Sequence, residues 1–83
     1  MTDMLTIEEQ IVSIIREFGQ VDCDIPLESD IYSEVGVESV NSIAILFGME
    51  EKFACTIDDR DFIQARSVTA LTQLIKNLKA GAV

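Results

Sequence analysis

Apolar side chains recur at helical spacing in three stretches of this chain, and this periodicity limits its possible folds more than any other feature. The stretches cover residues 7–18, 39–53 and 68–79, and residues 58–65 leave room for a short additional helix. A chain of 83 residues is too short to divide into two viable parts, so residues 1–83 should form a single domain. We therefore predict an all-α fold, a four-helix bundle with a long first loop and a short third helix.

The first helix is predicted over residues 7–18. Thr6 and Glu9 have the Thr-x-x-Glu spacing of a capping box, in which each side chain bonds the backbone N–H of the other residue. Gly19 should end the helix in the left-handed conformation. The predicted core face consists of Ile7, Ile11, Ile14, Ile15 and Phe18.

Residues 20–38 have no sustained periodicity and form a long connection. Connections beyond about 12–15 residues are uncommon in compact domains unless they are functional or packed down. The spacing from Ile31 to Val35 is compatible with a short helical turn, and Gly36 then supplies backbone freedom. The side chains expected to pin the connection to the core are Ile25, Leu27, Ile31 and Val35.

The second helix, predicted over residues 39–53, is apolar on two faces. A second stripe begins beside Ser39 and consists of Val40, Ala44 and Phe47. A domain this small cannot easily bury both faces, so we predict that this stripe is exposed to partners. The residues assigned to the core face are Ile43, Leu46, Met49 or Glu50, and Phe53.

The third helix is predicted from Asp58 to Gln64, with Phe62 and Ile63 facing inward. Ser67 is the expected N-cap of the last helix, predicted over residues 68–79. The core face assigned to that helix consists of Val68, Leu71, Leu74, Ile75 and Leu78.

The net charge of −9 excludes several classes of partner. Nucleic acids and anionic membranes are recognised by clustered Lys and Arg, so we expect neither as a partner. An acidic chain instead favours basic partners. Six acids precede Ser39 with no basic residue among them and form a candidate landing zone for such a partner: Asp22, Asp24, Glu28, Asp30, Glu34 and Glu38.

The chain contains no His, which excludes His-based metal sites and His-dependent catalysis. Cys23 and Cys55 lie far apart and, with no signal peptide, indicate a reduced, cytoplasmic protein. No apolar run is long enough to span a membrane. We therefore predict a monomeric, non-enzymatic module without a metal.

Ser39, in Gly36-Val37-Glu38-Ser39-Val40, has two interpretations. As an N-cap, its hydroxyl would accept a hydrogen bond from the first helical turn. As a chemical handle, the same hydroxyl would be exposed at the junction between loop and helix.

These features together resemble the acyl carrier protein family, small acidic four-helix bundles that carry 4′-phosphopantetheine on a serine. Val35-Gly36 matches the family's Leu-Gly, and Ser39 falls on its modified serine. Glu50-Glu51-Lys52-Phe53 resembles the end of the family's second helix, and Ser67-Val68 resembles the start of its last helix. The resemblance covers nearly the whole chain.

The resemblance implies that 4′-phosphopantetheine, derived from coenzyme A, is attached to Ser39 by a phosphopantetheinyl transferase. An acyl or aminoacyl cargo would then be exchanged with a cognate loading ligase and a downstream transferase. Glu38 would assist recognition by the phosphopantetheinyl transferase. Ile43, Leu46, Phe53, Phe62 and Val68 are candidates to shelter an aliphatic cargo, although core packing is the favoured interpretation for each.

Two departures from the family pattern affect the function. Glu38 and Val40 replace the Asp and Leu that usually flank the modified serine. Asn41 and Ala44 stand where general fatty acid carriers present acids to partners, next to Val40 and Phe47. We therefore predict a carrier dedicated to a specialised polyketide, peptide or aminoacyl-transfer pathway. The alternative is an unmodified acidic adaptor that binds a partner through its second helix and uses Ser39 only as a cap.

Overall fold

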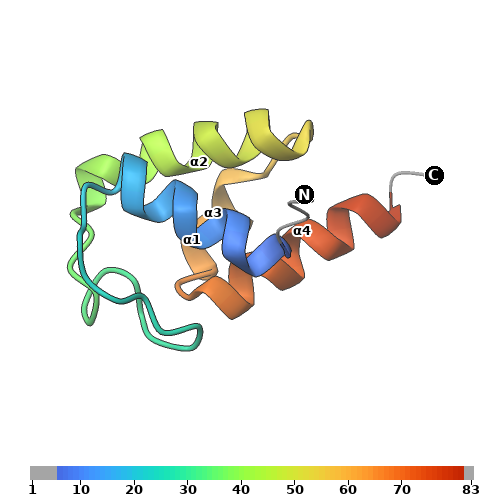
Figure 1. Cartoon of the computed structure of the whole chain (residues 1–83). Helices are drawn as coiled ribbons and strands as arrows, with labels where there is room; N and C mark the ends of the chain where they lie inside the picture. Colours follow the sequence, from blue (N-terminus) through green and yellow to red (C-terminus); the bar gives the residue numbers. More distant parts are fainter. Residues whose placement is uncertain (1–5, 82–83) are drawn as a thin grey trace, which may run out of the picture.

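Residues 6–81, which the computed structural model describes, form four helices and no strand (Figure 1). These helices are α1 (Ile7–Phe18), α2 (Ser39–Phe53), α3 (Asp59–Gln64) and α4 (Val68–Gly81). α1 packs against both α2 and α4, and the short α3 contacts α4. The predicted all-α bundle with a long first loop and a short third helix is confirmed.

Local side-chain bonds explain where α1 begins and ends. Thr6 Oγ1 accepts a hydrogen bond from the Glu9 N–H (3.1 Å), and Glu9 Oε1 accepts one from the Thr6 N–H (2.9 Å), so the capping box is confirmed. The prediction of a left-handed Gly19 is wrong, because its φ is −83° and Gln20 instead has a φ of 57°. Gly19 is required for close packing, since a Cβ there would lie 2.5 Å from the Ile15 carbonyl oxygen.

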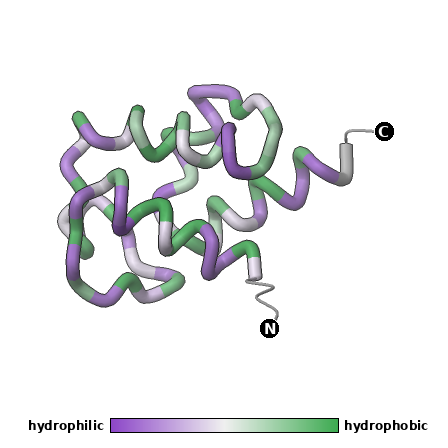
Figure 2. Tube along the Cα trace, turned by 45° about the horizontal axis from the view of Figure 1, so that its top comes forward, coloured by the Kyte–Doolittle hydropathy of each residue, from purple (hydrophilic) through white to green (hydrophobic). Residues whose placement is uncertain are grey.

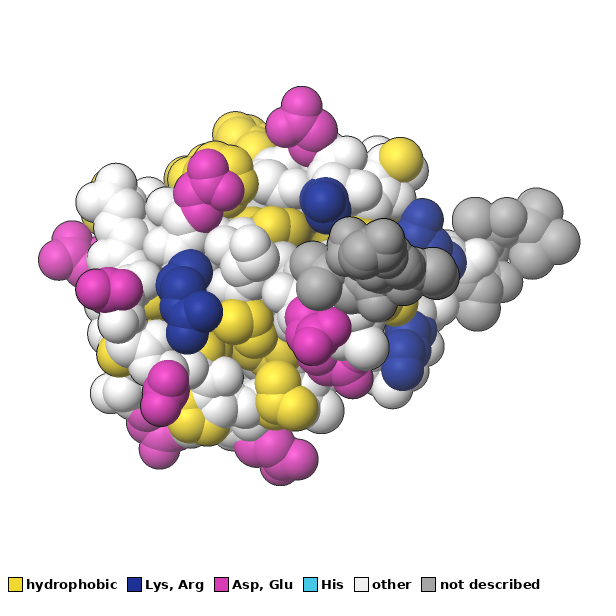
Figure 3. All heavy atoms as spheres, viewed as in Figure 1, with side chains coloured by type: hydrophobic (Ala, Val, Ile, Leu, Met, Phe, Trp, Pro, Cys, Tyr) yellow, Lys and Arg dark blue, Asp and Glu magenta, His cyan; other side chains and the backbone are white. Residues whose placement is uncertain are grey.

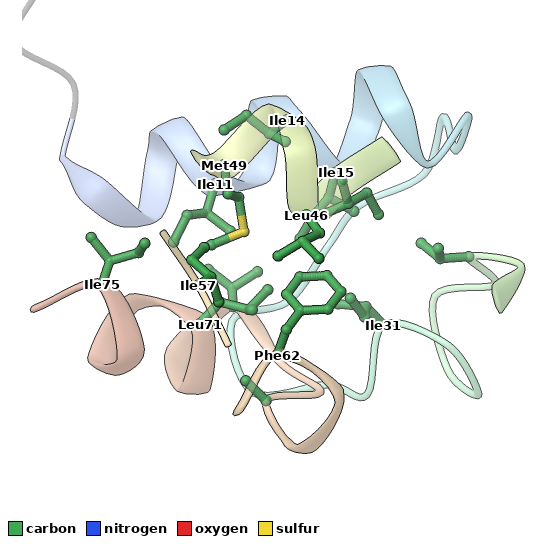
Figure 4. Close-up of a cluster of buried hydrophobic side chains, with 14 of the residues drawn as sticks. Ile11, Ile14, Ile15, Ile31, Leu46, Met49, Ile57, Phe62, Leu71 and Ile75 are labelled. Carbon is green, nitrogen blue, oxygen red and sulfur yellow. The ribbon is translucent and has the colours of Figure 1, made fainter. Parts of the chain in front are cut away.

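The core is aliphatic and is built from one face of each long helix. Hydrophobic and hydrophilic residues alternate along the helices at the spacing expected when one face is buried (Figure 2). Phe62 adds an aromatic ring from α3, which points toward Leu46 of α2 (Figure 4). The largest fully buried side chains are Ile11, Ile15, Ile31, Ile45, Met49, Val68, Leu71 and Ile75.

Four side chains assigned to the core are exposed instead. Phe18, the last residue of α1, is 37% exposed. Ile43 on α2 is 58% exposed, and its expected place is taken by Ile45, which is fully buried. α2 is apolar on so many positions that periodicity does not distinguish a face centred on Ile43 from one centred on Ile45. On α3, Phe62 is buried as predicted, but Ile63 is 64% exposed because a helix this short can bury only one side. The fourth exception, Leu27, lies in the long loop.

The long loop is packed down by three buried side chains, Ile25, Ile31 and Val37. The Ile31 N–H donates to the Arg66 carbonyl (2.8 Å), which joins the loop to the connection between α3 and α4. The prediction that the Leu27 side chain anchors the loop is wrong, because its carbonyl does so by accepting a hydrogen bond from the Thr69 N–H (2.9 Å).

Residues 31–34 form turns, and the Glu34 N–H donates to the Asp30 carbonyl (2.9 Å), as in the single helical turn that the spacing allowed. Asp30 Oδ1 accepts hydrogen bonds from the N–H groups of Tyr32 (2.8 Å) and Ser33 (3.0 Å). Such aspartate side-chain bonds satisfy the N–H groups at the start of a helical turn. Gly36 then has a φ of 101°, so the backbone freedom expected at this glycine is used.

Thr72 on α4 provides a test of the core. Its side chain is 4% exposed, and its hydroxyl has no hydrogen-bond partner within the described part of the chain. Thr72→Val should raise the free energy of unfolding by about 1 kcal/mol, because an unsatisfied buried hydroxyl is destabilising. Thr69→Val is the matched control, since the Thr69 hydroxyl donates to the Leu27 carbonyl (3.1 Å) and its removal should lower stability. Urea denaturation of both variants measures the difference, and a less stable Thr72→Val protein would contradict the assignment.

Candidate functional site

Ser39 is exposed and is the first residue of α2. The N-cap is Glu38, whose side chain makes no capping bond, so the interpretation of Ser39 as the N-cap is wrong. The helix already begins at the Glu38 carbonyl, which accepts a hydrogen bond from the Asn41 N–H (2.8 Å). Among the described residues the Ser39 hydroxyl has no hydrogen-bond partner, which leaves it free for chemistry.

The backbone around Ser39 is held from both sides. Val37 is buried, and its N–H donates to the Ile31 carbonyl (2.9 Å). Asn41 Nδ2 donates to the Gly19 carbonyl (3.4 Å), which ties the start of α2 to the end of α1. Ser42 Oγ donates to the Ser39 carbonyl itself (2.6 Å). Ser39 therefore presents a free hydroxyl from a fixed position.

Two pockets that share residues make a groove between α2 and α3. The first has a volume of about 220 Å³ and lies beside Ser39; it is lined by Tyr32, Ser39, Ser42, Phe62, Ile63 and Arg66. The second has a volume of about 440 Å³ and is lined by Ser42, Ile43, Leu46, Phe47, Asp59, Phe62 and Ile63. Ser42, Phe62 and Ile63 belong to both, so the groove runs from Ser39 into a largely apolar hollow.

Four exposed side chains form an apolar patch along the same groove: Val40, Ile43, Phe47 and Ile63. Val40 is 73% exposed and Phe47 is 61% exposed, so the predicted stripe is on the surface at both positions. Ala44 and Asn41 are half-buried, and Glu38 is exposed beside Ser39. Sequence reasoning assigned Ile43 and Ile63 to the core and therefore missed half of this patch.

A charged cluster lies at the Ser39 end of the groove. Arg66 Nε donates to Asp30 Oδ2 (2.6 Å), and Arg66 Nη2 donates to Asp30 Oδ1 (3.3 Å). The guanidinium also lies over the Tyr32 ring, 4.8 Å from its centroid. The Arg66 hydrogen bond and the Ser33 backbone N–H hold the pKa of Asp30 at about 2. Sequence reasoning missed this cluster, although Arg66 was one of only six basic residues available to pair with the acidic loop.

The pairing of Asp30 changes the predicted acidic landing zone. Asp30 is neutralised by Arg66, and the Glu34 carboxylate accepts a hydrogen bond from the Asp30 N–H (2.8 Å). The other four acids of the group are exposed: Asp22, Asp24, Glu28 and Glu38. Acidic side chains also outnumber basic ones across the face drawn in Figure 3.

Comparison with known families agrees with this geometry. A family model described as the phosphopantetheine attachment site matches residues 9–75, which include all of α2 and α3. The chain belongs to this family. It is a carrier protein whose prosthetic group is 4′-phosphopantetheine, and it is not an enzyme. Proteins of this kind are modified by a phosphopantetheinyl transferase and interact with biosynthetic enzymes.

The described residues fit such a group. An unbonded, exposed hydroxyl on a fixed backbone is accessible to a modifying enzyme, and the adjoining groove offers both a cation and an apolar surface. Residues 6–81 contain no cluster of three or more potential metal ligands. None of the helices in the described range has the length and apolar character needed to cross a membrane.

The Asp30–Arg66 pair makes the stability of the carrier pH-dependent. The pKa of Asp30 is lowered from 3.8 to about 2 in the folded protein, so the pair stabilises the fold fully above pH 3.8. This stabilisation should be lost as the pH falls through about 2. Asp30→Asn removes the titrating group while its side-chain oxygen still accepts the turn hydrogen bonds. Denaturation of both proteins across this range should show their difference in unfolding free energy shrinking with acidity, and a constant difference would contradict the pairing.

Proposed function

We propose that this protein carries an acyl or aminoacyl group as a thioester on 4′-phosphopantetheine attached to Ser39, in a specialised biosynthetic pathway. The observation that carries the proposal is the free, exposed Ser39 hydroxyl at the head of α2. Other serines near helix starts are engaged: Ser67 Oγ accepts a hydrogen bond from the Ala70 N–H (3.1 Å), and Ser42 Oγ donates to the Ser39 carbonyl. Ser67 is thus the N-cap that the sequence predicted.

Attachment at Ser39 is a balanced exchange of phosphate bonds. Ser39 Oγ forms a bond to the phosphorus that bears the pantetheine in coenzyme A, and the pyrophosphate bond breaks. Adenosine 3′,5′-bisphosphate leaves with the bonding electrons, and the Ser39 hydroxyl proton passes to a base of the transferase. When bound, the group supplies a terminal thiol that holds the cargo as a thioester.

The surface of α2 supports a dedicated set of partners. The first turn of α2 contains no acid, and its exposed side chains from Val40 to Phe47 are apolar; the exposed charged residues Glu51 and Lys52 lie near the end of the helix. The Glu50 carboxylate, further along α2, accepts a hydrogen bond from the Ile57 N–H (2.9 Å) within the domain. We infer that partners dock on the apolar patch, with Glu38, Asn41 and Ala44 at its edge and the exposed loop acids steering the approach.

The groove between α2 and α3 supports an apolar cargo. Of the five residues considered for this role, Ile43, Leu46 and Phe62 line the groove. Phe53 and Val68 lie in the core and do not line it. An aliphatic chain lying in this groove would cover part of the apolar patch, which favours its transient retention.

Ser39→Ala should abolish attachment of the cofactor. The apo-protein is incubated with coenzyme A and a broad-specificity phosphopantetheinyl transferase, and the mass is measured. Ser42→Ala removes a hydroxyl from the same groove and should still gain the mass of one phosphopantetheine. Because the Ser39 side chain makes no hydrogen bond, the alanine variant should change stability by only about 0.5 kcal/mol or less. A Ser39→Ala protein that is still modified would refute the assignment.

Phe47→Ala should weaken cargo transfer with the cognate enzyme without unfolding the domain. Loss of a central aromatic at an interface costs about 2 kcal/mol or more, which is roughly thirty-fold in affinity. Leu27→Ala is the control, because Leu27 is an exposed apolar residue on the long loop, outside the patch. Phe53→Ala is the buried comparator and should lose about 3–5 kcal/mol of stability. Unchanged transfer rates for Phe47→Ala would exclude the patch as the docking surface.

A further inference from the structure

Arg66 lines the pocket beside Ser39 and still has hydrogen-bond donors to offer. Its Nε and one Nη2 hydrogen are used by Asp30, and its side chain is 50% exposed. The Nη1 group and the second Nη2 hydrogen have no acceptor among residues 6–81. The guanidinium is held in place on one edge by Asp30 and on one face by the Tyr32 ring.

This pocket has a single basic side chain. Its other lining residues are a phenol, two serines and two apolar side chains, contributed by Tyr32, Ser39, Ser42, Phe62 and Ile63. A phosphodiester on Ser39 would add negative charge next to Glu38, in a chain whose net charge is already −9. The start of α2 offers partial compensation through the helix dipole. Arg66 is the one full positive charge that shares a pocket with Ser39.

We propose that Arg66 binds the phosphodiester of the prosthetic group on Ser39. The proposal rests on the proposed attachment at Ser39. Arginine suits this role because its planar donors match phosphate oxygens in pairs. Arg66 is then a positioning residue, which holds the phosphate end of the prosthetic group at the mouth of the groove between α2 and α3.

The test uses the holo-protein and the ³¹P NMR resonance of its phosphodiester. In the wild-type protein this resonance should be displaced from its position in the same protein unfolded in urea. Arg66→Gln should lose most of that displacement. Arg60→Gln is the matched control, because Arg60 is exposed on α3, does not line the pocket and carries the same charge. It should leave the resonance where the wild type has it.

A second variant separates phosphate binding from a purely structural role of Arg66. Asp30→Asn breaks the same ion pair but leaves the guanidinium present, so it should keep the displaced resonance. The Arg66 Nε–H signal should also shift when apo-protein becomes holo-protein, and the Arg60 signal should not. Thermal unfolding of each variant reports the loss of stability independently.

Three results would overturn the proposal. A modified Arg66→Gln protein with the wild-type resonance would remove Arg66 from the site and leave the proposed function intact. An Asp30→Asn protein that reproduces the Arg66→Gln change would show that the effect is structural. A wild-type protein that gains neither mass nor a phosphorus resonance on treatment with coenzyme A would overturn both proposals, because nothing would then be attached to Ser39.

Discussion

The long first loop docks on the connection between α3 and α4 through the buried Ile31 side chain and the Ile31 N–H bond to the Arg66 carbonyl. The position of Ser39 depends on this docking, because Ile31 in turn accepts the Val37 N–H, just before α2 begins. The same connection carries the Arg66 guanidinium to Asp30. A single junction therefore fixes the loop, the start of α2 and the charged wall of the groove.

The acidic side chains that could attract a partner and the apolar side chains that could contact it lie on different parts of the surface. The exposed acids before α2 provide a long-range field, which would increase association rates with the basic partners expected from the sequence and would weaken with salt. The apolar patch on α2 and α3 provides the surface that a partner would cover, and a helix without acids in its first turn requires less desolvation of charge there. With docking on this patch, as proposed, selection among partners would depend on shape complementarity to Phe47 and its neighbours more than on ion pairs.

The sequence predicts the helices of this fold better than the faces that they bury. Helix bounds follow from local signals such as the Thr6–Glu9 capping box, which act within one turn. Ile45 is buried and Ile43 is exposed because of the way α2 is rotated about its axis against α1. Apolar residues occur on more than one face of α2, so the sequence of this helix alone does not predict which face is buried. The sequence makes Ser39 a candidate because motif and position coincide, whereas Arg66 reaches the pocket beside Ser39 only through the tertiary fold.

The small size of the domain explains why it would shelter a cargo without enclosing that cargo. A bundle of this length buries too little surface to build a closed chamber, and the groove between α2 and α3 has only two walls. A cargo held in such a groove would lose little binding free energy on leaving, because the groove covers only part of the cargo's surface. The apolar patch flanks the same groove, so a partner docking on Phe47 and Ile63 would compete with the cargo for one surface. Under the proposed function, docking of a partner would thereby displace the cargo without a moving part in the carrier.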